Sequence, residues 1–516
     1  MSVALPGFVI ETLIVLTVLF VFMVGIAVLA IVILFILFIV DVAQTKHAIR
    51  RNYPVIGRFR YLLEHLGTFF RQYFFAMDRE EMPFNREQRN YVYRAAKNVD
   101  TTVAFGSTRD LRPVGTVMFV NCPFPTLDTD AVETSAVTIG PYCPNPYTTR
   151  SIFNISGMSF GAISHVAVRA LSRGAAKAGA WLNTGEGGLS PYHLEGGCDI
   201  VFQMGTAKYG VRDEAGNLSD DKLREIAAHE QVRMFEIKMS QGAKPGKGGI
   251  LPGVKVTPEI AKIRGIPVGQ DSISPNRHPE VDSPGELLDL IDRTSRVTGK
   301  PVGFKAVIGA YGWLDELFAE IRRRGIRSAP DFITIDSADG GTGAAPSSLV
   351  DYVGLPISQS LPIVVDRLVA HGLRERVKVI ASGKLVTPAD VAWALCVGAD
   401  FCLSARGFMF ALGCIQALRC NKNTCPTGIT AHNPRLQRGL DPADKAIRVQ
   451  HYIENMVHEI GVIAHSCGVR EPRLLRRYHA SIMVHDGRVR SISEIHPDVA
   501  PGSAVVSPAS VSAKAP

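Results

Sequence analysis

Eight short apolar runs recur between residues 150 and 405, and most are separated by segments with the 3.6-residue apolar period of an amphipathic helix. The runs cover residues 152–155, 180–182, 234–237, 271–273, 302–307, 332–335, 377–380 and 401–403. The helical patterns cover residues 166–178, 258–264, 285–297, 314–324 and 388–397. Strand–helix units in succession favour a parallel sheet covered by helices. Eight units predict an α/β fold of the (β/α)8 TIM-barrel type, with a doubly wound open sheet as the alternative.

A charge-free apolar block fills residues 13–40, between Glu11 and Asp41. As a helix it would extend about 42 Å, against about 30 Å for the hydrocarbon core of a bilayer. A cleaved signal peptide is the competing interpretation, but its apolar region spans about 7–15 residues and follows a positive charge. Here the first basic residue is Lys46. The block therefore predicts a single-pass membrane helix, with the catalytic portion after it in the cytoplasm.

Basic residues gather directly after this block, and the whole chain carries a net charge of +8. The basic residues are Lys46, Arg50, Arg51, Arg58, Arg60 and Arg71. Basic residues beside an apolar span face anionic lipid headgroups more often than nucleic acid. We therefore expect membrane lipid, and no nucleic acid, as the partner of this segment.

These features divide the chain into four predicted parts. They are a membrane anchor at 1–45, a basic juxtamembrane cap at 46–130, a barrel at 131–480 and a C-terminal extension at 481–516. The stretch from Val499 onward is rich in Pro, Ala, Ser and Val and carries few charges. This composition predicts a disordered tail.

The loops that follow the predicted strands are rich in glycine, and in such barrels these loops carry the chemistry. The need for tight turns would explain the glycines of any single loop, but six glycine-rich loops on the same barrel face favour a ligand site. Ser382, Gly383, Arg406 and Gly407 follow the seventh and eighth runs, where barrel enzymes often hold a phosphate. No strand is followed by the G-x-G-x-x-G pattern in a nucleotide-binding context, so we expect no built-in NAD(P)H domain.

Several cationic side chains lie at or after the predicted strands. Lys305 sits inside an apolar run, where a lysine needs an anionic partner such as a reduced flavin. Lys238, Lys244, Lys247 and Arg264 suggest a site for an acidic substrate. Glu186, between glycines, is a candidate proton donor or orienting group.

The chain has nine cysteines, and an odd number in a chain with a cytoplasmic catalytic portion argues against a disulfide framework. Cys414, Cys420 and Cys425 follow the spacing C-x5-C-x4-C, and Pro426 follows the last of them. Cysteine followed by proline recurs in iron–sulfur ligand loops. The spacing alone leaves an iron–sulfur cluster, a zinc ion and plain burial open.

Six motifs between about residue 150 and residue 435 resemble the FMN-binding domain of glutamate synthase. They are Ser156-Gly157-Met158-Ser159-Phe160-Gly161, Gly185-Glu186-Gly187-Gly188, the segment from Glu236-Ile237-Lys238 through Gln241-Gly242-Ala243-Lys244-Pro245-Gly246, Leu251-Pro252-Gly253-Val254-Lys255-Val256-Thr257, Asp339-Gly340-Gly341-Thr342-Gly343-Ala344, and Asn423-Thr424-Cys425-Pro426-Thr427-Gly428. The motifs are long, specific and in the same order as in the family.

The resemblance implies that FMN lies in the barrel mouth and receives electrons through a [3Fe-4S] cluster held by Cys414, Cys420 and Cys425. It implies hydride transfer to the imine of 2-oxoglutarate and ammonia, with Glu186, Lys238, Lys244 and Arg264 around the substrate. The cofactor contacts that it implies are Gly157, Met158, Ser159, Gln203, Lys305, Gly340, Gly341, Ser382, Gly383, Arg406 and Gly407.

The sequence departs from the family pattern at three points. A membrane anchor stands where glutamine-dependent members carry a glutaminase domain, so we expect ammonia, or an amine from a partner, as the nitrogen source. Ile250 replaces a family glutamine and Lys247 a family glutamate, while Ser382-Gly383-Lys384 replaces an Asp-Gly-Gly sequence.

These departures keep two alternatives open. One is an electron-transfer component of a membrane complex, and the other is a flavin dehydrogenase for another small acid. The expected electron donor is a reduced ferredoxin, and a homo-oligomer is also compatible with the sequence.

Overall fold

The computed structural model describes residues 7–504, and the chain forms two compact units, residues 1–87 and 88–516. The predicted boundaries at residues 45, 130 and 480 stay predictions, and the division between the units falls at 87/88, inside the predicted cap. The first unit contains α1 (Gly7–Ala43), α2 (Ala48–Asn52), α3 (Gly57–Phe70) and a π-helical turn, η1 (Arg71–Phe75). By length and composition α1 can cross a membrane, with a mean hydropathy of 3.4 in its most apolar window; a signal sequence would pass the same test.

The second unit is built on a closed barrel of eight parallel strands. In chain order they are β4 (Phe153–Ile155), β5 (Leu182–Asn183), β6 (Ile200–Met204), β7 (Val232–Lys238), β10 (Val302–Val307), β11 (Phe332–Asp336), β12 (Lys378–Ser382) and β13 (Phe401–Ser404). The last strand pairs with the first, with Cys402 opposite Phe153. This closure confirms the predicted (β/α)8 barrel and excludes the open sheet.

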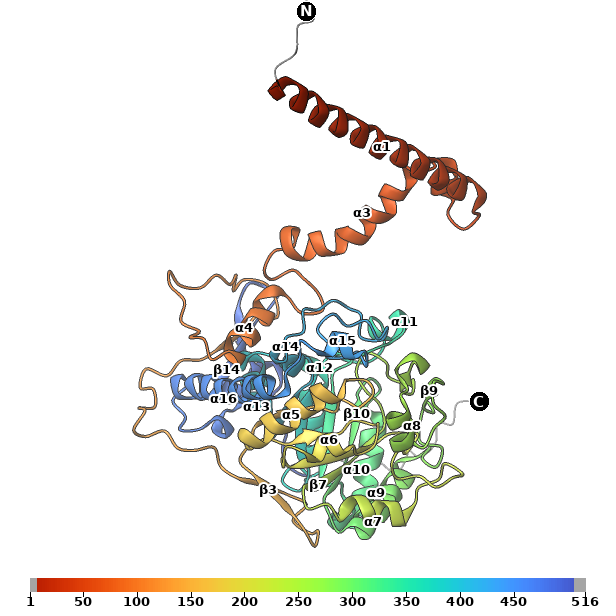
Figure 1. Ribbon diagram of the computed structural model, residues 1–516. Helices are drawn as coiled ribbons and strands as arrows, with labels where there is room; N and C mark the ends of the chain where they lie inside the picture. The colour runs from red at the N-terminus through yellow and green to blue at the C-terminus, as the bar shows by residue number, and fades with distance from the viewer. Residues whose placement is uncertain (1–6, 505–516) are drawn as a thin grey trace, which may run out of the picture. The chain divides into compact units, whose positions relative to one another are not determined.

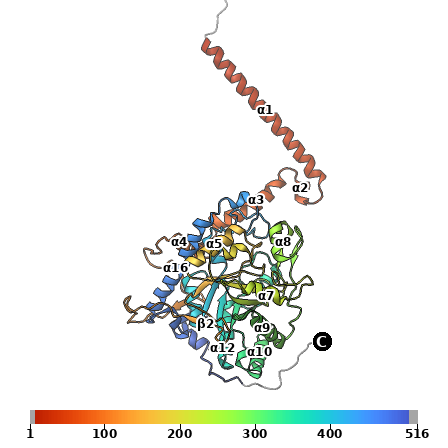
Figure 2. The same cartoon turned by 60° about the horizontal axis from the view of Figure 1, so that its bottom comes forward.

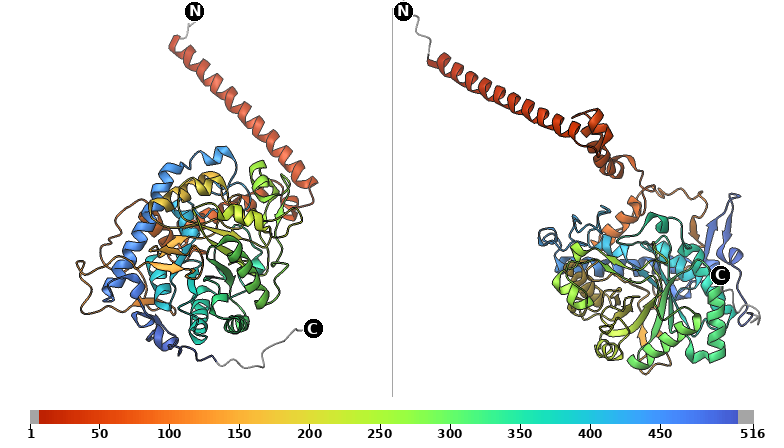
Figure 3. Two further views of the ribbon diagram at one scale, coloured as in Figure 1. Left: turned by 90° about the horizontal axis from the view of Figure 1, so that it is seen from below. Right: turned by 90° about the vertical axis from the view of Figure 1, so that its right-hand side faces the viewer.

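Helices surround the strands in all views of the second unit (Figures 1, 2 and 3). The longer ones are α5 (His165–Lys177), α7 (Asp220–Ala227), α9 (Pro284–Thr298), α10 (Gly312–Arg324), α12 (Ile357–Ala370), α13 (Pro388–Val397) and α16 (Pro442–Ser466). Their ends follow familiar signals. Thr387 caps α13 by accepting a hydrogen bond from the Asp390 N–H, and Pro388 occupies the first turn. The predicted helices at 258–264 and 388–397 match α8 (Pro258–Arg264) and α13 residue for residue.

One predicted barrel strand is wrong. The run at 271–273 contains β9 (Ser272–Ile273), which pairs antiparallel with β8 (Ile250–Leu251) outside the barrel and leaves Ile273 66% exposed. The third barrel strand is instead β6, which the prediction missed. Gln203 interrupts the apolar run of β6, because its side chain makes a buried hydrogen bond inside the barrel.

A β-hairpin contributes to the core near the amino ends of the strands. Its strands are β2 (Val137–Ile139) and β3 (Tyr147–Thr149). Ile139 and Tyr147 of the hairpin join Trp181, Phe332 and Phe401 in one buried cluster. Phe332 and Phe401 are the first residues of their strands, so this core leaves the carboxyl ends of the strands for the loops that carry ligand sites.

The C-terminal extension continues the folded unit. Strand β14 (Ala480–Met483) lies between β1 (Val117–Phe119) and β15 (Val489–Ser491) in an antiparallel sheet, and α17 (Ile492–Ile495) follows. The predicted tail begins at Val499. The Gly502 and Ala504 N–H groups donate to the carbonyl oxygens of Val369 and Ala370 of α12, and the rest of the predicted tail lies outside the described residues.

Candidate active site

A large pocket opens at the carboxyl ends of the barrel strands. Its empty volume, counting the open mouth, is about 1330 Å³, enough for a ligand of cofactor size. Most of the predicted site residues line it, namely Gly157, Met158, Ser159, Glu186, Gln203, Lys238, Lys244, Arg264, Lys305, Gly341, Ser382, Gly383, Arg406 and Cys420. The structure therefore brings together residues that lie up to 263 positions apart in the chain.

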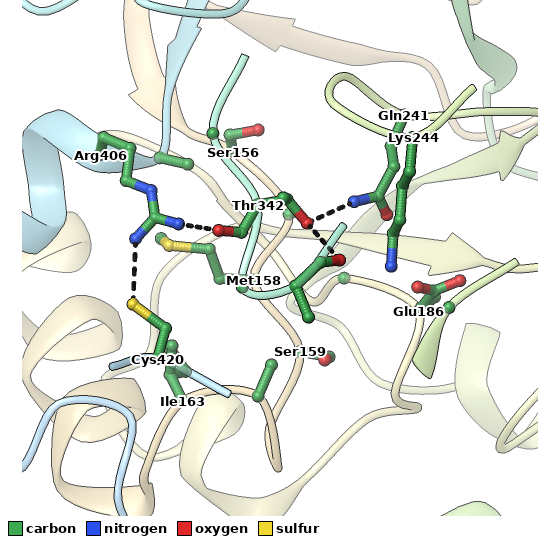
Figure 4. A pocket seen from close by; sticks show the side chains of 18 of the residues that line it. Ser156, Met158, Ser159, Ile163, Glu186, Gln241, Lys244, Thr342, Arg406 and Cys420 are labelled. Atoms are coloured by element: carbon green, nitrogen blue, oxygen red, sulfur yellow. Dashed lines mark hydrogen bonds between the residues drawn. The ribbon is translucent and has the colours of Figure 1, made fainter. Parts of the chain in front are cut away.

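Glu186 is the acidic centre of one side of the pocket. Its Oε1 lies 2.7 Å from the Lys238 Nζ, and the Lys244 side chain extends toward it (Figure 4). A Cβ atom at Gly205 would come within 2.6 Å of the Glu186 Cβ, and one at Gly249 within 2.4 Å of its Oε1. Only glycine at these two positions leaves room for the carboxylate.

Arg264 completes this group, which we call the Glu186 cluster: Glu186, Lys238, Lys244 and Arg264. The Arg264 guanidinium donates to the Phe160 carbonyl oxygen at 3.1 Å and to the Ser159 and Ser272 hydroxyls at 3.3 Å. It also lies over the Tyr209 ring, 5.2 Å from its centre. These contacts fix the guanidinium at the wall of the pocket.

The pKa values of the Glu186 cluster reflect burial and mutual charge. Burial raises the pKa of Glu186, but Lys238, Lys244 and Arg264 outweigh it, so the pKa lies below its ordinary value and the group is a carboxylate. The pKa of Lys238 is lowered to about 8, chiefly by burial and also by the positive charges of Lys305 and Lys244. The negative charge of Glu186 opposes this change by raising the pKa. The pKa of Lys244 is lowered, chiefly by burial. The cluster thus joins an ionised acid to an ammonium that titrates close to neutral pH.

A second carboxylate, Glu236, lies inside the barrel. It accepts hydrogen bonds from the Asn183 amide at 2.9 Å, the Gln203 amide at 2.6 Å and the Thr334 hydroxyl at 2.6 Å. A Cβ at Gly157 would lie 2.8 Å from the Asn183 Oδ1, so the first loop passes close to this network. The sequence prediction did not assign Glu236 a role, although a glutamate within an apolar strand was a usable signal.

Lys305 has an anionic partner within the protein. Its Nζ lies 3.6 Å from the Asp336 Oδ2, and Asp336 also accepts from the Gly242 N–H and the Ser382 hydroxyl, each at 3.0 Å. Lys305 remains a pocket-lining residue, so a flavin partner for it stays a prediction.

Arg406 dominates the opposite side of the pocket. Its guanidinium donates to the Thr342 carbonyl oxygen and lies 3.7 Å from the Cys420 Sγ (Figure 4). A Cβ at Gly341 would lie 2.6 Å from the Arg406 Nε, so only glycine lets the guanidinium cross there. Gly383 has a φ of +113° and also lines the pocket. Backbone N–H groups, a hydroxyl and a guanidinium form a donor set suited to a phosphate.

Two predicted cofactor residues do not line the pocket. The Gly340 N–H donates to the Ser337 carbonyl oxygen at 3.0 Å, which closes a turn. The Gly407 N–H donates to the Ser404 hydroxyl at 3.3 Å, and a Cβ there would lie 2.3 Å from the Tyr452 hydroxyl oxygen. In this structure Gly340 belongs to a tight turn, and Gly407 leaves room for the Tyr452 side chain.

Comparison with known proteins assigns the chain to a family. Residues 118–470 match the model of the conserved region in glutamate synthase. The chain belongs to the glutamate synthase family. It is 39% identical to the glutamate synthase large subunit-like protein YerD of Bacillus subtilis (strain 168), over 88% of this chain and 93% of that protein. It is 35% identical to the archaeal-type glutamate synthase [NADPH] of Thermotoga sp. (strain RQ2), over 62% of this chain but only 60% of that enzyme.

Among solved structures, the chain is similar to a chimeric (S)-mandelate dehydrogenase. The identity is 14% and the TM-score 0.46, over 76% of this chain and 98% of that one. This likeness concerns the fold alone.

The residues at which the sequence was expected to depart from the glutamate synthase pattern have different surroundings in the structure. Ile250 lines the pocket and is 38% exposed. Lys247 is exposed three residues after Lys244 and contributes to lowering its pKa. Lys384 forms a 2.8 Å ion pair with Asp339. Ile250, Ser382 and Lys384 line the pocket, whereas Lys247 is not among the lining residues.

The three cysteines predicted as metal ligands share one loop but differ in surroundings. All are free thiols, and Cys420 reaches the pocket. Burial raises the pKa of Cys414 to about 11. The pKa of Cys425 lies below its ordinary value, because hydrogen bonds from Thr427 and Thr430 outweigh the opposing effect of burial. Between residues 7 and 504, no three histidine, cysteine, aspartate or glutamate side chains are arranged to hold a metal ion, so the cluster stays a prediction.

Lys255 is a residue beside this loop that the prediction did not single out. It is 2% exposed, and its Nζ donates to the carbonyl oxygens of Ala162 at 2.6 Å and Cys420 at 3.2 Å. It thereby ties the cysteine loop to the first glycine-rich loop of the barrel. A lysine in the Pro-Gly-Val-Lys motif was visible in the sequence, but its partners were not.

Proposed function

We propose that this protein is a flavin- and iron–sulfur-dependent oxidoreductase that aminates a 2-oxo acid reductively with ammonia. The Glu186 cluster carries the proposal. It combines a carboxylate, a lysine with a pKa of about 8 and two further cations at the wall of one pocket. Such a site can hold a carboxylate substrate and move a proton.

FMN is the flavin that we assign to the pocket. Its phosphate would be held by Ser382, the Gly383 N–H and Arg406, and its ring would lie against the loop at Gly157–Ser159. Lys305 and Gln203 would face the polar edge of the ring. When bound, FMN supplies the hydride that reduces the imine.

The substrate is a 2-oxo acid, with 2-oxoglutarate as the first candidate. Lys244 and Arg264 would hold its carboxylates, which orients the 2-carbon toward the flavin. Ammonia condenses with the carbonyl group to an imine with loss of water, and a hydride plus a proton complete the amino acid. The Lys238–Glu186 pair, 2.7 Å apart, is suited to deliver that proton.

The electrons would enter through the cysteine loop. Cys414, Cys420 and Cys425 offer three thiolates and no carboxylate, a donor set that suits an iron–sulfur cluster better than a hard cation. Arg406 lies 3.7 Å from the Cys420 Sγ and lines the pocket, so it would contact both the cluster-holding loop and the flavin. A small reduced iron–sulfur protein such as a ferredoxin is the proposed donor.

The site of action would be the membrane surface. We assign α1 as a single membrane span, with the barrel on its C-terminal, cytoplasmic side, because Lys46, Arg50 and Arg51 follow the span directly.

An anaerobic single-turnover experiment tests the proposal. The purified protein is reduced chemically and mixed with ammonia and 2-oxoglutarate, and reoxidation of the flavin is followed by absorbance. We expect reoxidation only when both compounds are present. Reoxidation by another 2-oxo acid would redefine the substrate, whereas reoxidation only by a protein or a quinone would replace the proposal with an electron-transfer role.

A further inference from the structure

Helix α3 carries a continuous apolar stripe that no predicted feature of the sequence anticipated. Its large apolar residues recur at intervals of three and four, which is the period of one helix face. Most of them are exposed, and the exposure continues into η1. The exposed members are Phe59 at 61%, Leu62 at 50%, Leu63 at 62%, Phe69 at 40%, Phe70 at 46%, Tyr73 at 54% and Phe74 at 74%.

The polar residues of α3 fall between these positions. Glu64, His65 and Thr68 are exposed and occupy the opposite side of the helical period, while Arg60 and Arg71 fall at the edge of the stripe. An arginine at such an edge can lay its apolar stem along a lipid-facing surface and place its guanidinium among headgroups. The helix therefore has the residue pattern of a segment that lies in a membrane surface.

The start of α3 is fixed to the end of α1 through Asp41. This carboxylate is fully buried and accepts hydrogen bonds from the Arg50 Nε at 2.9 Å, the Arg58 Nε at 2.7 Å and the Val55 N–H at 3.0 Å. Gly57 allows the start of α3 to approach α2 closely, because a Cβ there would lie 2.8 Å from the Ile49 carbonyl oxygen.

Asp41 is the first charged residue after the apolar block at 13–40. The contacts of Arg58 with Asp41 therefore hold the first turn of α3 where the hydrocarbon-compatible part of α1 ends. A stripe that begins at this level meets the boundary between headgroups and acyl chains, about 5–10 Å deep in the interface.

We propose that α3 and η1 lie in the plane of the membrane surface, with this stripe buried in the headgroup–acyl boundary and Asp41 setting its depth. The partner is a bilayer with anionic lipid, because Arg51, Arg60 and Arg71 add positive charge at the same level. The inference rests on the assignment of α1 as a membrane span, not on the proposed chemistry.

Tryptophan fluorescence in vesicles of brominated lipid tests this depth with the full chain. The three natural tryptophans, Trp181, Trp313 and Trp393, all belong to the second unit and give the background. Probes are introduced singly as Phe74→Trp and Phe59→Trp in the stripe, Glu64→Trp on the polar face as the matched control, and Ile26→Trp in the middle of the apolar block. Bromine is placed either near the headgroups or deep in the acyl chains.

We expect both stripe probes to be quenched roughly twofold or more strongly by shallow than by deep bromine, Ile26→Trp to show the reverse, and Glu64→Trp to change little. Unquenched stripe probes beside a quenched Ile26→Trp would overturn the proposal, because the stripe would then pack against protein, either the barrel or a second copy. Stronger quenching of the stripe by deep bromine, or an unquenched Ile26→Trp, would overturn it as well. None of these readings depends on flavin or iron.

Discussion

The Glu186 cluster and the cysteine loop (residues 413–426) lie on the same barrel mouth but are organised in opposite ways. In the cluster, Lys238 is buried, Glu186 is half-buried, and the two are already paired at 2.7 Å. In the loop, Ile415 and Leu418 are exposed, and Gln416, Leu418 and Asn423 adopt positive φ values. The thiols form no metal-binding group within the described part of the chain.

This difference separates two ways of building a site. The protein's own charges preorganise the Glu186 cluster, so its geometry exists before a substrate arrives. The loop has three thiols in a backbone with several positive φ values, and under the proposed function its order would come from what these thiols bind. Substitutions in the cluster should therefore change rates and pH profiles, whereas substitutions in the loop should change cofactor content.

The largest effect is expected from Cys420→Ser. Loss of one of three thiolates should remove the iron signal entirely, because a three-iron cluster needs each of its cysteine ligands. Iron analysis and electron paramagnetic resonance measure it. Cys198→Ser is the matched control, since Cys198 is a buried thiol beside Ser172. An unchanged iron signal in Cys420→Ser would rule out the ligand assignment.

Glu186→Gln should slow reoxidation of the reduced flavin by substrate by about 100-fold or more, as expected when a positioned acid–base group is lost. The substitution also leaves Lys238 without its carboxylate partner, while the bound FMN should stay unchanged. Stopped-flow absorbance gives the rate. Glu195→Gln, which weakens an ion pair with Arg169, is the control, and equal rates in the two variants would show that Glu186 takes no part.

The pH dependence should follow Lys238. Its pKa of about 8 means that the ammonium is present below that pH and is lost above it. Substrate-dependent reoxidation should therefore fall about tenfold per pH unit above pH 8, because the neutral amine cannot donate the proton. In Lys238→Arg, which keeps its charge, this fall should disappear. A decline at the same pH in that variant would assign the titration to another group.

The smallest effect is expected at the rim. Ile250→Gln restores an amide at the mouth of the pocket, and one added hydrogen bond of about 1 kcal/mol should tighten 2-oxoglutarate binding about fivefold. The substrate concentration dependence of reoxidation measures it, with Ile273→Gln on the neighbouring strand as the control. Weaker binding in Ile250→Gln would indicate that the pocket is shaped for a more apolar 2-oxo acid.

The sequence predicted the architecture well where local pattern decides structure. Strand β10 and helices α8 and α13 match their predicted bounds, because apolar period, prolines and caps are local signals. It failed at β6, where Gln203 serves the Glu236 network and breaks the apolar run. Residues 271–273 were wrongly predicted as a barrel strand, because a short strand outside the barrel can have the same composition as a buried barrel strand.

The site was predictable in residue identity but not in contacts. Glycine-rich loops and lysines at or after the predicted strands pointed to Glu186, Lys238 and Lys244. Long-range geometry alone shows that Gly205 and Gly249 make room for Glu186, or that Lys255 joins Ala162 to Cys420. The amphipathic pattern of α3 was present in the sequence, but its attachment to Asp41 depends on the turn between two helices.

Cofactor content tests the central claim most directly. Full-length protein, purified without oxygen from membranes, should contain about one FMN and about three iron atoms per chain, and should be yellow-brown. Colourless protein without flavin or iron, obtained under the same conditions, would contradict the proposed chemistry at both the Glu186 cluster and the cysteine loop.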